Sequence, residues 1–315
     1  MSAVIRDVLS NAAWISSRAR WLAAAFGLLT VTVAAAGWWS LSMPLPNEER
    51  FIEMLIQGHR RQVHYDVFLP DEKHRVAARH PAIILLHGVE GAERYERSYH
   101  QTARRLNREG YAVFYVHYFD TVAYDDLWLC DDQKCLDTKA IGKFCAADSA
   151  NWTEGVVAVI ADIGDREDID HDAIAIQGFS LGGYLALAAT SSQVESMTLP
   201  EIAAVVVHWG AMFEDTRLER GFPATLFVHG ECDSVVPMKD ARATFDLLRR
   251  VECDAEFVVV PGGGHTASSA DSLARTKDFL DRHLQAKRRM AKQISLEPAW
   301  NGLTFSDRDF WGMAR

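Results

Sequence analysis

A serine at position 180 lies in the sequence GFSLGG (residues 178–183), a Gly-x-Ser-x-Gly pattern typical of a nucleophile on a sharp turn. The apolar run AIAIQ precedes the pattern and LGGYLALAAT follows it, so a strand, a turn and a helix succeed one another as the motif requires. Glycines beside the serine permit the strained backbone that exposes its hydroxyl. Ser180 is therefore the predicted nucleophile.

Two later segments supply partners for such a serine. Asp233 lies in FVHGECDSVVP (residues 227–237), and His265 ends VVVPGGGH (residues 258–265). The order serine, aspartate, histidine, each just past a predicted strand, is that of an α/β-hydrolase triad, with His265 as general base and Asp233 orienting it. Glu214 and Asp215 follow an earlier strand and are the weaker candidates for the acid.

An early loop completes the predicted site. The run AIILLHGVEG (residues 82–91) is a strand that ends in His-Gly. Loops of this kind supply one backbone donor of an oxyanion hole, and the residue after the nucleophile supplies the other. We predict that the amides of Val89 and Leu181 form the oxyanion hole.

Other side chains near strand ends leave two interpretations open. Tyr118, Trp209 and Met212 either line an acyl pocket or belong to the core. Glu90 and Asp120 either face the substrate or are solvated loop charges, and we favour the second reading.

The rest of the chain alternates strands and helices, which predicts a mostly parallel sheet with helices on both faces. Most of the predicted strands are short apolar runs of the kind that is covered on both faces. The first of them is expected to be an antiparallel edge. The predicted strands are residues 64–69, 82–86, 112–117, 173–177, 203–208, 225–229 and 256–260, and the predicted helices are 97–107, 151–166, 181–190, 239–251 and 271–287.

With these motifs in order, the chain resembles the dienelactone hydrolase family of α/β-hydrolases over about residues 60–288. The resemblance rests on GFSLGG, HGECDSVVP and PGGGH. It implies hydrolysis of an ester or lactone through an acyl-enzyme, with no metal or organic cofactor. Two departures stand out: the family nucleophile is a cysteine where this chain has Ser180, and a family glutamate in the early loop is replaced by Gly88. We therefore expect a serine esterase rather than an enzyme acting on dienelactone. The alternatives are a peptidase of related fold and a non-catalytic binding module.

An apolar segment precedes this domain. Residues 1–20 form a basic leader with Arg18 and Arg20, and residues 21–41 carry no charge. About 20 apolar residues are long enough to cross a bilayer, and the flanking charges keep the leader in the cytoplasm. The catalytic domain, residues 50–288, would then lie outside the cytoplasm, on the periplasmic side in a bacterium. A signal peptide cleaved near residues 34–36 is the alternative, and it also predicts export.

Charge and cysteines set further limits. The 33 Lys+Arg against 43 Asp+Glu give a net charge of −10, which disfavours nucleic-acid binding. Residues 119–148 form an insert in which Cys130, Cys135 and Cys145 predict a local disulfide of any pairing, and we hypothesise that it caps the site. Residues 289–315 form an aromatic tail. No metal site is expected, because the histidines at strand ends lack a two-His helical spacing.

Overall fold

The computed structural model describes residues 44–122, 138–191 and 199–284, with no side-chain detail for 138–147. The chain divides into two units, Met1–Leu45 and Pro46–Arg315, and only Pro44 and Leu45 of the first are described. The apolar segment 21–41, the tail 289–315, and Cys130 and Cys135 therefore lie outside the described residues. Among the helices that are described, none is long and apolar enough to cross a membrane.

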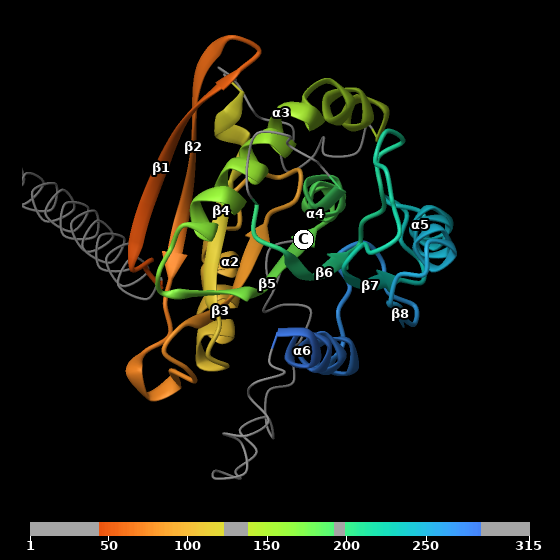
Figure 1. Cartoon of the computed structure of the whole chain (residues 1–315). Helices are drawn as coiled ribbons and strands as arrows, with labels where there is room; N and C mark the ends of the chain where they lie inside the picture. Colours follow the sequence, from red (N-terminus) through yellow and green to blue (C-terminus); the bar gives the residue numbers. More distant parts are fainter. Residues whose placement is uncertain (1–43, 123–137, 192–198, 285–315) are drawn as a thin grey trace, which may run out of the picture. The chain divides into compact units, whose positions relative to one another are not determined.

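One eight-stranded sheet forms the centre of the second unit (Figure 1). Strands β1 and β2 are antiparallel to each other and β2 is antiparallel to β4, whereas all later neighbours are parallel. The order across the sheet is β1 (Glu48–Ile56), β2 (His59–Phe68), β4 (Ala112–His117), β3 (His80–Leu86), β5 (Ile169–Phe179), β6 (Ile202–His208), β7 (Ala224–Gly230) and β8 (Ala255–Val260).

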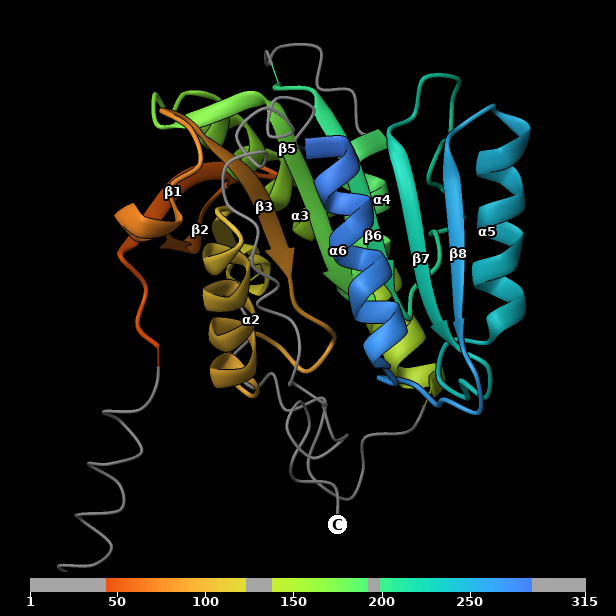
Figure 2. The same ribbon diagram turned by 90° about the horizontal axis from the view of Figure 1, so that it is seen from below.

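Helices cover both faces of this sheet. Figure 2 shows α2 (Glu96–Arg108) and α6 (Ala270–Leu284) on the near face, with α3 (Thr138–Gly164) and α4 (Leu181–Ser191) behind the strands. Helix α5 (Met238–Arg250) packs on the same side as α4, since its Ala241 and Leu248 join the core cluster that contains Leu185. Two short 3-10 turns, η1 (Glu72–His74) and η2 (Tyr118–Thr121), complete the described elements.

The apolar runs read from the sequence form the buried middle of the sheet. Every residue of β3 and β4 is buried, as expected of strands packed between two helical layers. The carboxyl ends of β3, β5, β7 and β8 point the same way, because these strands are parallel. Loops that follow them therefore meet at one edge of the sheet, where open α/β sheets bind ligands.

Two expectations about the fold were wrong. The antiparallel edge strand is β1, which the sequence did not suggest because most of its side chains alternate between exposed and half-buried and it carries four charges within EERFIEMLI. Strand β2 is therefore antiparallel but internal. Helix α3 begins at Thr138 rather than near residue 151, so residues 138–148 of the predicted insert are helical and Cys145 lies on this helix.

Candidate active site

Ser180 occupies the turn between β5 and α4 with a left-handed backbone, φ +51°. A side chain at Gly178 would place its Cβ 2.0 Å from the Gly182 carbonyl oxygen, and one at Gly182 would lie 2.5 Å from the Leu86 and His87 carbonyl oxygens. The turn is thus closed by backbone on both sides of the serine, and glycine is needed at both positions. The Ser180 amide donates to the His208 carbonyl at 2.8 Å, which fixes the turn to β6.

The structure brings Ser180, His265 and Asp233 into one hydrogen-bonded chain. His265 Nε2 lies 2.9 Å from Ser180 Oγ, and His265 Nδ1 lies 2.8 Å from Asp233 Oδ2. In this arrangement the imidazole Nδ1–H donates to the carboxylate, and Nε2 can accept the serine proton. Glu214 and Asp215, the weaker candidates for the acid, are exposed and make no bond to His265.

Asp233 is buried beneath the imidazole yet held as a carboxylate. Burial alone would raise its pKa, but the hydrogen bond from His265 and the amides of Val236 and Val235 together hold the pKa below its usual value. Both amides donate to Oδ1 at 2.9 Å, while Oδ2 is left to the histidine. A second imidazole, His229, lies 3.3 Å from Oδ2 and is kept neutral because burial lowers its pKa.

The histidine loop is fixed from two sides. Trp209 has a positive φ of +55° and donates its indole N–H to the Ala267 carbonyl at 2.8 Å. A Cβ at Gly230, at the end of β7, would lie 2.2 Å from the Gly264 carbonyl oxygen, so the acid loop and the histidine loop are in backbone contact. These contacts define the position of His265 relative to Asp233.

The early loop after β3 is held by two tyrosines. Tyr118 donates its hydroxyl to the His87 carbonyl at 2.8 Å, and its ring stacks on the His87 imidazole. The Gly88 amide donates to the Tyr99 hydroxyl at 3.1 Å, and that hydroxyl donates to Glu90 Oε1 at 2.5 Å. Burial lowers the pKa of His87 to about 3, so this imidazole is a neutral packing element.

Glu90 fits neither interpretation drawn from the sequence. Its carboxylate folds back on its own loop and accepts from Tyr99 and from the Gly88 amide. Burial raises its pKa above the usual value, and the hydrogen bonds only partly offset this. The sequence did not predict Tyr99 or the supporting role of Glu90, because their hydrogen bond joins a loop to a helix.

The amides predicted to form an oxyanion hole are available. Within the described part of the chain, neither Leu181 N–H nor Val89 N–H donates a hydrogen bond. Leu181 is the first residue of α4, where the helix dipole favours negative charge. The close approach of Gly182 to the His87 carbonyl brings the helix and the early loop together. Their role as an oxyanion hole stays a prediction.

The predicted pocket residues have other roles in this structure. Tyr118 is 0% exposed and Trp209 is 2% exposed, and each bonds to a backbone carbonyl, which favours the core interpretation over the pocket interpretation for both. Met212 is partly buried against the core, and its amide donates to Thr244 Oγ1 at 3.1 Å. Cys232, beside the acid, is an exposed free thiol, and Cys253 is buried and free.

A separate polar cluster lies on β2 and β4. Asp66 is bonded to His100 Nε2 at 3.1 Å and to His117 Nε2 at 3.2 Å, and His64 bonds Asp120 at 3.1 Å. Burial alone would raise the pKa of Asp66, but the surrounding histidines hold it far below its usual value. Burial alone would lower the pKa of His64, yet its two carboxylate partners raise it to about 9. Among the described residues, the group His64, Asp66 and His117 could hold a metal ion.

The sheet order, the strained serine turn and the Ser–His–Asp chain define an enzyme of the α/β-hydrolase class. A family model described as "Dienelactone hydrolase family" matches residues 67–292. The chain belongs to this family and is a hydrolase, which confirms the resemblance read from the motifs.

Named relatives and solved structures agree with this placement. The chain is 32% identical to acyl-protein thioesterase 1 homolog 1 of Dictyostelium discoideum, over 38% of this chain and 53% of that protein. It is 26% identical to acyl-protein thioesterase 1 of Neurospora crassa, over 66% of this chain and 89% of that protein. For two of the curated relatives, including the first, the chain spans only about half of their length (53% and 50%).

Two solved structures show the same fold at low identity. A dienelactone hydrolase-like promiscuous phosphotriesterase from metagenomic libraries has a TM-score of 0.56 at 17% identity, covering 75% of this chain and 98% of that one. A thermophilic esterase from Thermogutta terrifontis has a TM-score of 0.51 at 14% identity, covering 78% and 98%.

Proposed function

We propose that this protein is a serine hydrolase that cleaves carboxylic esters or lactones through an acyl-enzyme, with Ser180, His265 and Asp233 as its triad. The observation that carries the proposal is the continuous hydrogen-bonded chain Ser180 Oγ–His265 Nε2, His265 Nδ1–Asp233 Oδ2, at 2.9 and 2.8 Å. A serine and a histidine at this distance are close enough for proton transfer during attack.

The reaction follows from these contacts. Ser180 Oγ attacks the substrate carbonyl carbon while its proton passes to His265 Nε2, and the carbonyl oxygen becomes an oxyanion facing the Leu181 and Val89 amides. The C–O bond to the leaving group then breaks, and the leaving alkoxide takes the proton from His265. Water next attacks the acyl-enzyme with His265 again as base, which releases the acid and restores Ser180. Asp233 stays ionised and stabilises the imidazolium.

The family and its relatives support the proposed substrate class. The family model is that of dienelactone hydrolases, and the two similar structures are a dienelactone hydrolase-like phosphotriesterase and an esterase. The named relatives are acyl-protein thioesterases. Thioesters undergo the same acyl transfer to a serine, so they belong in the substrate panel beside oxygen esters. A small-molecule ester is the proposed substrate, with no cofactor required by the chemistry above.

A fluorophosphonate probe tests the nucleophile. We expect covalent labelling of the full chain, complete loss of labelling in Ser180→Ala, and normal labelling in Ser234→Ala, whose serine is exposed in the acid loop. Absence of labelling in all three folded proteins, or labelling of Ser180→Ala, would refute the proposal. A panel of p-nitrophenyl esters of rising chain length, an acyl thioester and a peptide then defines the substrate and separates an esterase from a peptidase.

The location of the enzyme is a separate proposal. Residues 21–41 are uncharged and long enough to cross a bilayer, and the arginines precede them. We infer an anchored enzyme with its catalytic domain outside the cytoplasm. The full chain should remain in membranes after alkaline extraction, and an alkaline phosphatase fused after residue 288 should be active. An inactive fusion would contradict export, and a fully extractable, shortened chain would indicate a cleaved leader.

A further inference from the structure

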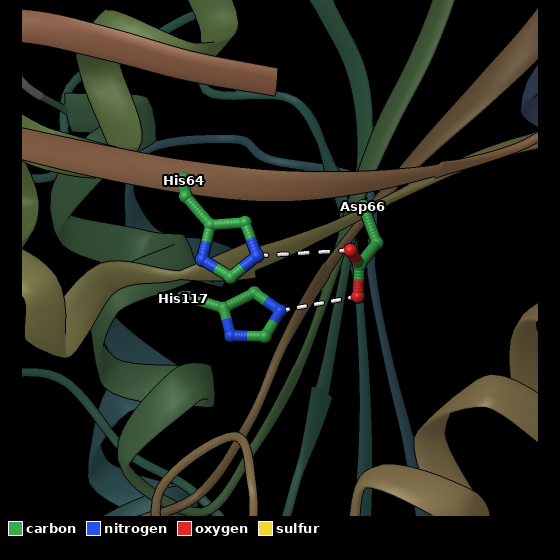
Figure 3. Close-up of side chains that lie close together, drawn as sticks. All are labelled: His64, Asp66 and His117. Atoms are coloured by element: carbon green, nitrogen blue, oxygen red, sulfur yellow. Dashed lines mark hydrogen bonds and ion pairs between the residues drawn. The ribbon is translucent and has the colours of Figure 1, made fainter. Parts of the chain in front are cut away.

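Two histidines and an aspartate face one another on the side of the sheet that α2 covers. His64 on β2 is the register partner of His117 on β4, and Asp66 lies two residues along the same face of β2. Figure 3 shows both imidazoles with one nitrogen turned toward the Asp66 carboxylate. Each of the three residues offers a ligand atom within 4.8 Å of the other two.

We propose that His64, Asp66 and His117 form a binding site for a divalent transition metal ion, with Zn²⁺ as the preferred ion. Two imidazole nitrogens and one carboxylate oxygen are a donor set that suits Zn²⁺ and related ions, whereas Ca²⁺ and Mg²⁺ prefer oxygen alone. The site is independent of the triad and of the proposed reaction.

The distances between the donor atoms suit such an ion. His117 Nε2 lies 3.2 Å from Asp66 Oδ2, and His64 Nε2 lies 3.7 Å from the other oxygen of the same carboxylate, Oδ1. With one ligand atom taken from each residue, the three atoms lie within 4.8 Å of one another. Bonds of about 2.0–2.2 Å in a tetrahedral zinc site place neighbouring ligand atoms roughly 3.3 Å apart. The imidazole rings of His64 and His117 overlap, with centroids 3.7 Å apart and planes 30° from parallel, so the rings must rotate for the three donors to surround one ion.

Outer contacts already orient two of the ligands. His64 Nδ1 lies 3.1 Å from Asp120 Oδ2, so a metal on Nε2 would complete the carboxylate–histidine–metal arrangement common in zinc sites. His100, from α2, is 3.1 Å from Asp66 Oδ2 and fixes that carboxylate. Both outer residues come from elements other than β2, since Asp120 lies on η2 and His100 on α2.

One side of the cluster is open to solvent. The Asp66 side chain is 5% exposed, while those of His64 and Asp120 are 21% and 44% exposed. An ion can enter from the side of His64, and a water molecule can take the fourth position. The bound ion would join β2 to β4 next to Tyr118, whose hydroxyl holds the His87 carbonyl. Its expected effect is therefore on stability.

Zinc titration of the full-length chain, stripped of metal and kept in a mild detergent, tests the site. We expect one saturable Zn²⁺ per chain by calorimetry and metal analysis, with a rise in Tm because the ion binds the folded state. His64→Gln and His117→Gln should each weaken binding by at least about 100-fold, more than loss of an outer contact. His59→Ala, an exposed histidine on the same strand, should bind as the parent does.

Asp120→Asn is a second variant that keeps the proposal testable if the histidine variants do not fold. The Asp120 side chain is 44% exposed, so we expect Asp120→Asn to change the metal-free Tm only slightly, and zinc affinity should fall about 10-fold. The proposal is overturned if the parent chain shows no saturable Zn²⁺ binding and no Tm rise, which would leave a metal-free ion-pair network. It is also overturned if binding survives unchanged in the folded His64→Gln and Asp120→Asn variants, which would place the ion on cysteines or elsewhere.

Discussion

Tyr118, the residue that follows β4, donates its hydroxyl to the carbonyl of His87 at the end of β3, 2.8 Å away. This bond joins the early loop to the neighbouring strand end, and Tyr118 directly follows His117 of the polar cluster of β2 and β4. The orientation of the Val89 amide depends on that loop.

Tyr118→Phe removes only this hydroxyl. We expect a loss of about 1 kcal/mol in the free energy of unfolding, since a buried hydrogen bond contributes about that much. The value of kcat should also fall, because the early loop becomes less well fixed. Urea unfolding and ester hydrolysis measure the two effects, and a variant with unchanged stability and kcat would show that the bond does not order the loop.

Asp233→Asn tests the proposed acid of the triad. An amide in place of the carboxylate disturbs the tautomer of His265, and the loss of kcat should be about 10²–10⁴-fold. Asp246→Asn, an exposed aspartate on α5, is the matched control and should keep full activity. Equal activities of the two variants, both folded by circular dichroism, would remove Asp233 from the mechanism.

The glycines beside Ser180 should tolerate no side chain. Gly178→Ala places a Cβ 2.0 Å from a backbone oxygen, so we expect a loss of about 3 kcal/mol in the free energy of unfolding. Gly264→Ala is the control for stability, because no atom lies within 4 Å of the added Cβ and its φ is not left-handed. Equal Tm values for the two variants would argue against the close turn.

The raised pKa of Glu90 leads us to expect that the free energy of unfolding depends on pH. Burial raises the pKa of its carboxyl above the ordinary 4.5, so the folded state prefers the protonated form. The stabilisation that this protonated carboxyl contributes to the free energy of unfolding is fully present below pH 4.5. It is lost as the pH rises through the pKa that Glu90 has in the folded state. Glu90→Gln keeps an oxygen for the Tyr99 hydroxyl and removes the titration.

The difference in unfolding free energy between the parent and Glu90→Gln should therefore shift in favour of the variant as the pH rises above 4.5. Denaturant curves from pH 4 to pH 8 measure it. Parallel stability profiles for the two proteins would contradict a raised pKa at Glu90.

Local patterns predicted much of this structure. The seven predicted strands all exist, because apolar runs such as residues 82–86 are covered on both faces and their composition reflects that burial. The sequence also named Ser180, Asp233 and His265, which the fold brings together, since each follows a strand within a recognisable local pattern.

What the sequence did not predict depends on pairing across the chain. Strand β1 carries no apolar run, and its pairing with β2 becomes apparent only in the sheet. Tyr99 and Glu90 join a helix to a loop, and His64 meets His117 through strand register. A search for helical His spacing could not find the last pair, because its members are neighbours across two strands.

The acyl-enzyme itself provides the most direct test of the central claim. The full chain is mixed with a p-nitrophenyl ester, quenched in acid within one turnover and digested for mass spectrometry. We predict a burst of nitrophenol and an acyl mass on the peptide that contains Ser180, with both absent in Ser180→Ala and both retained in Cys232→Ser. Hydrolysis that persists in Ser180→Ala, or an acyl group found on Cys232 instead, would contradict the account.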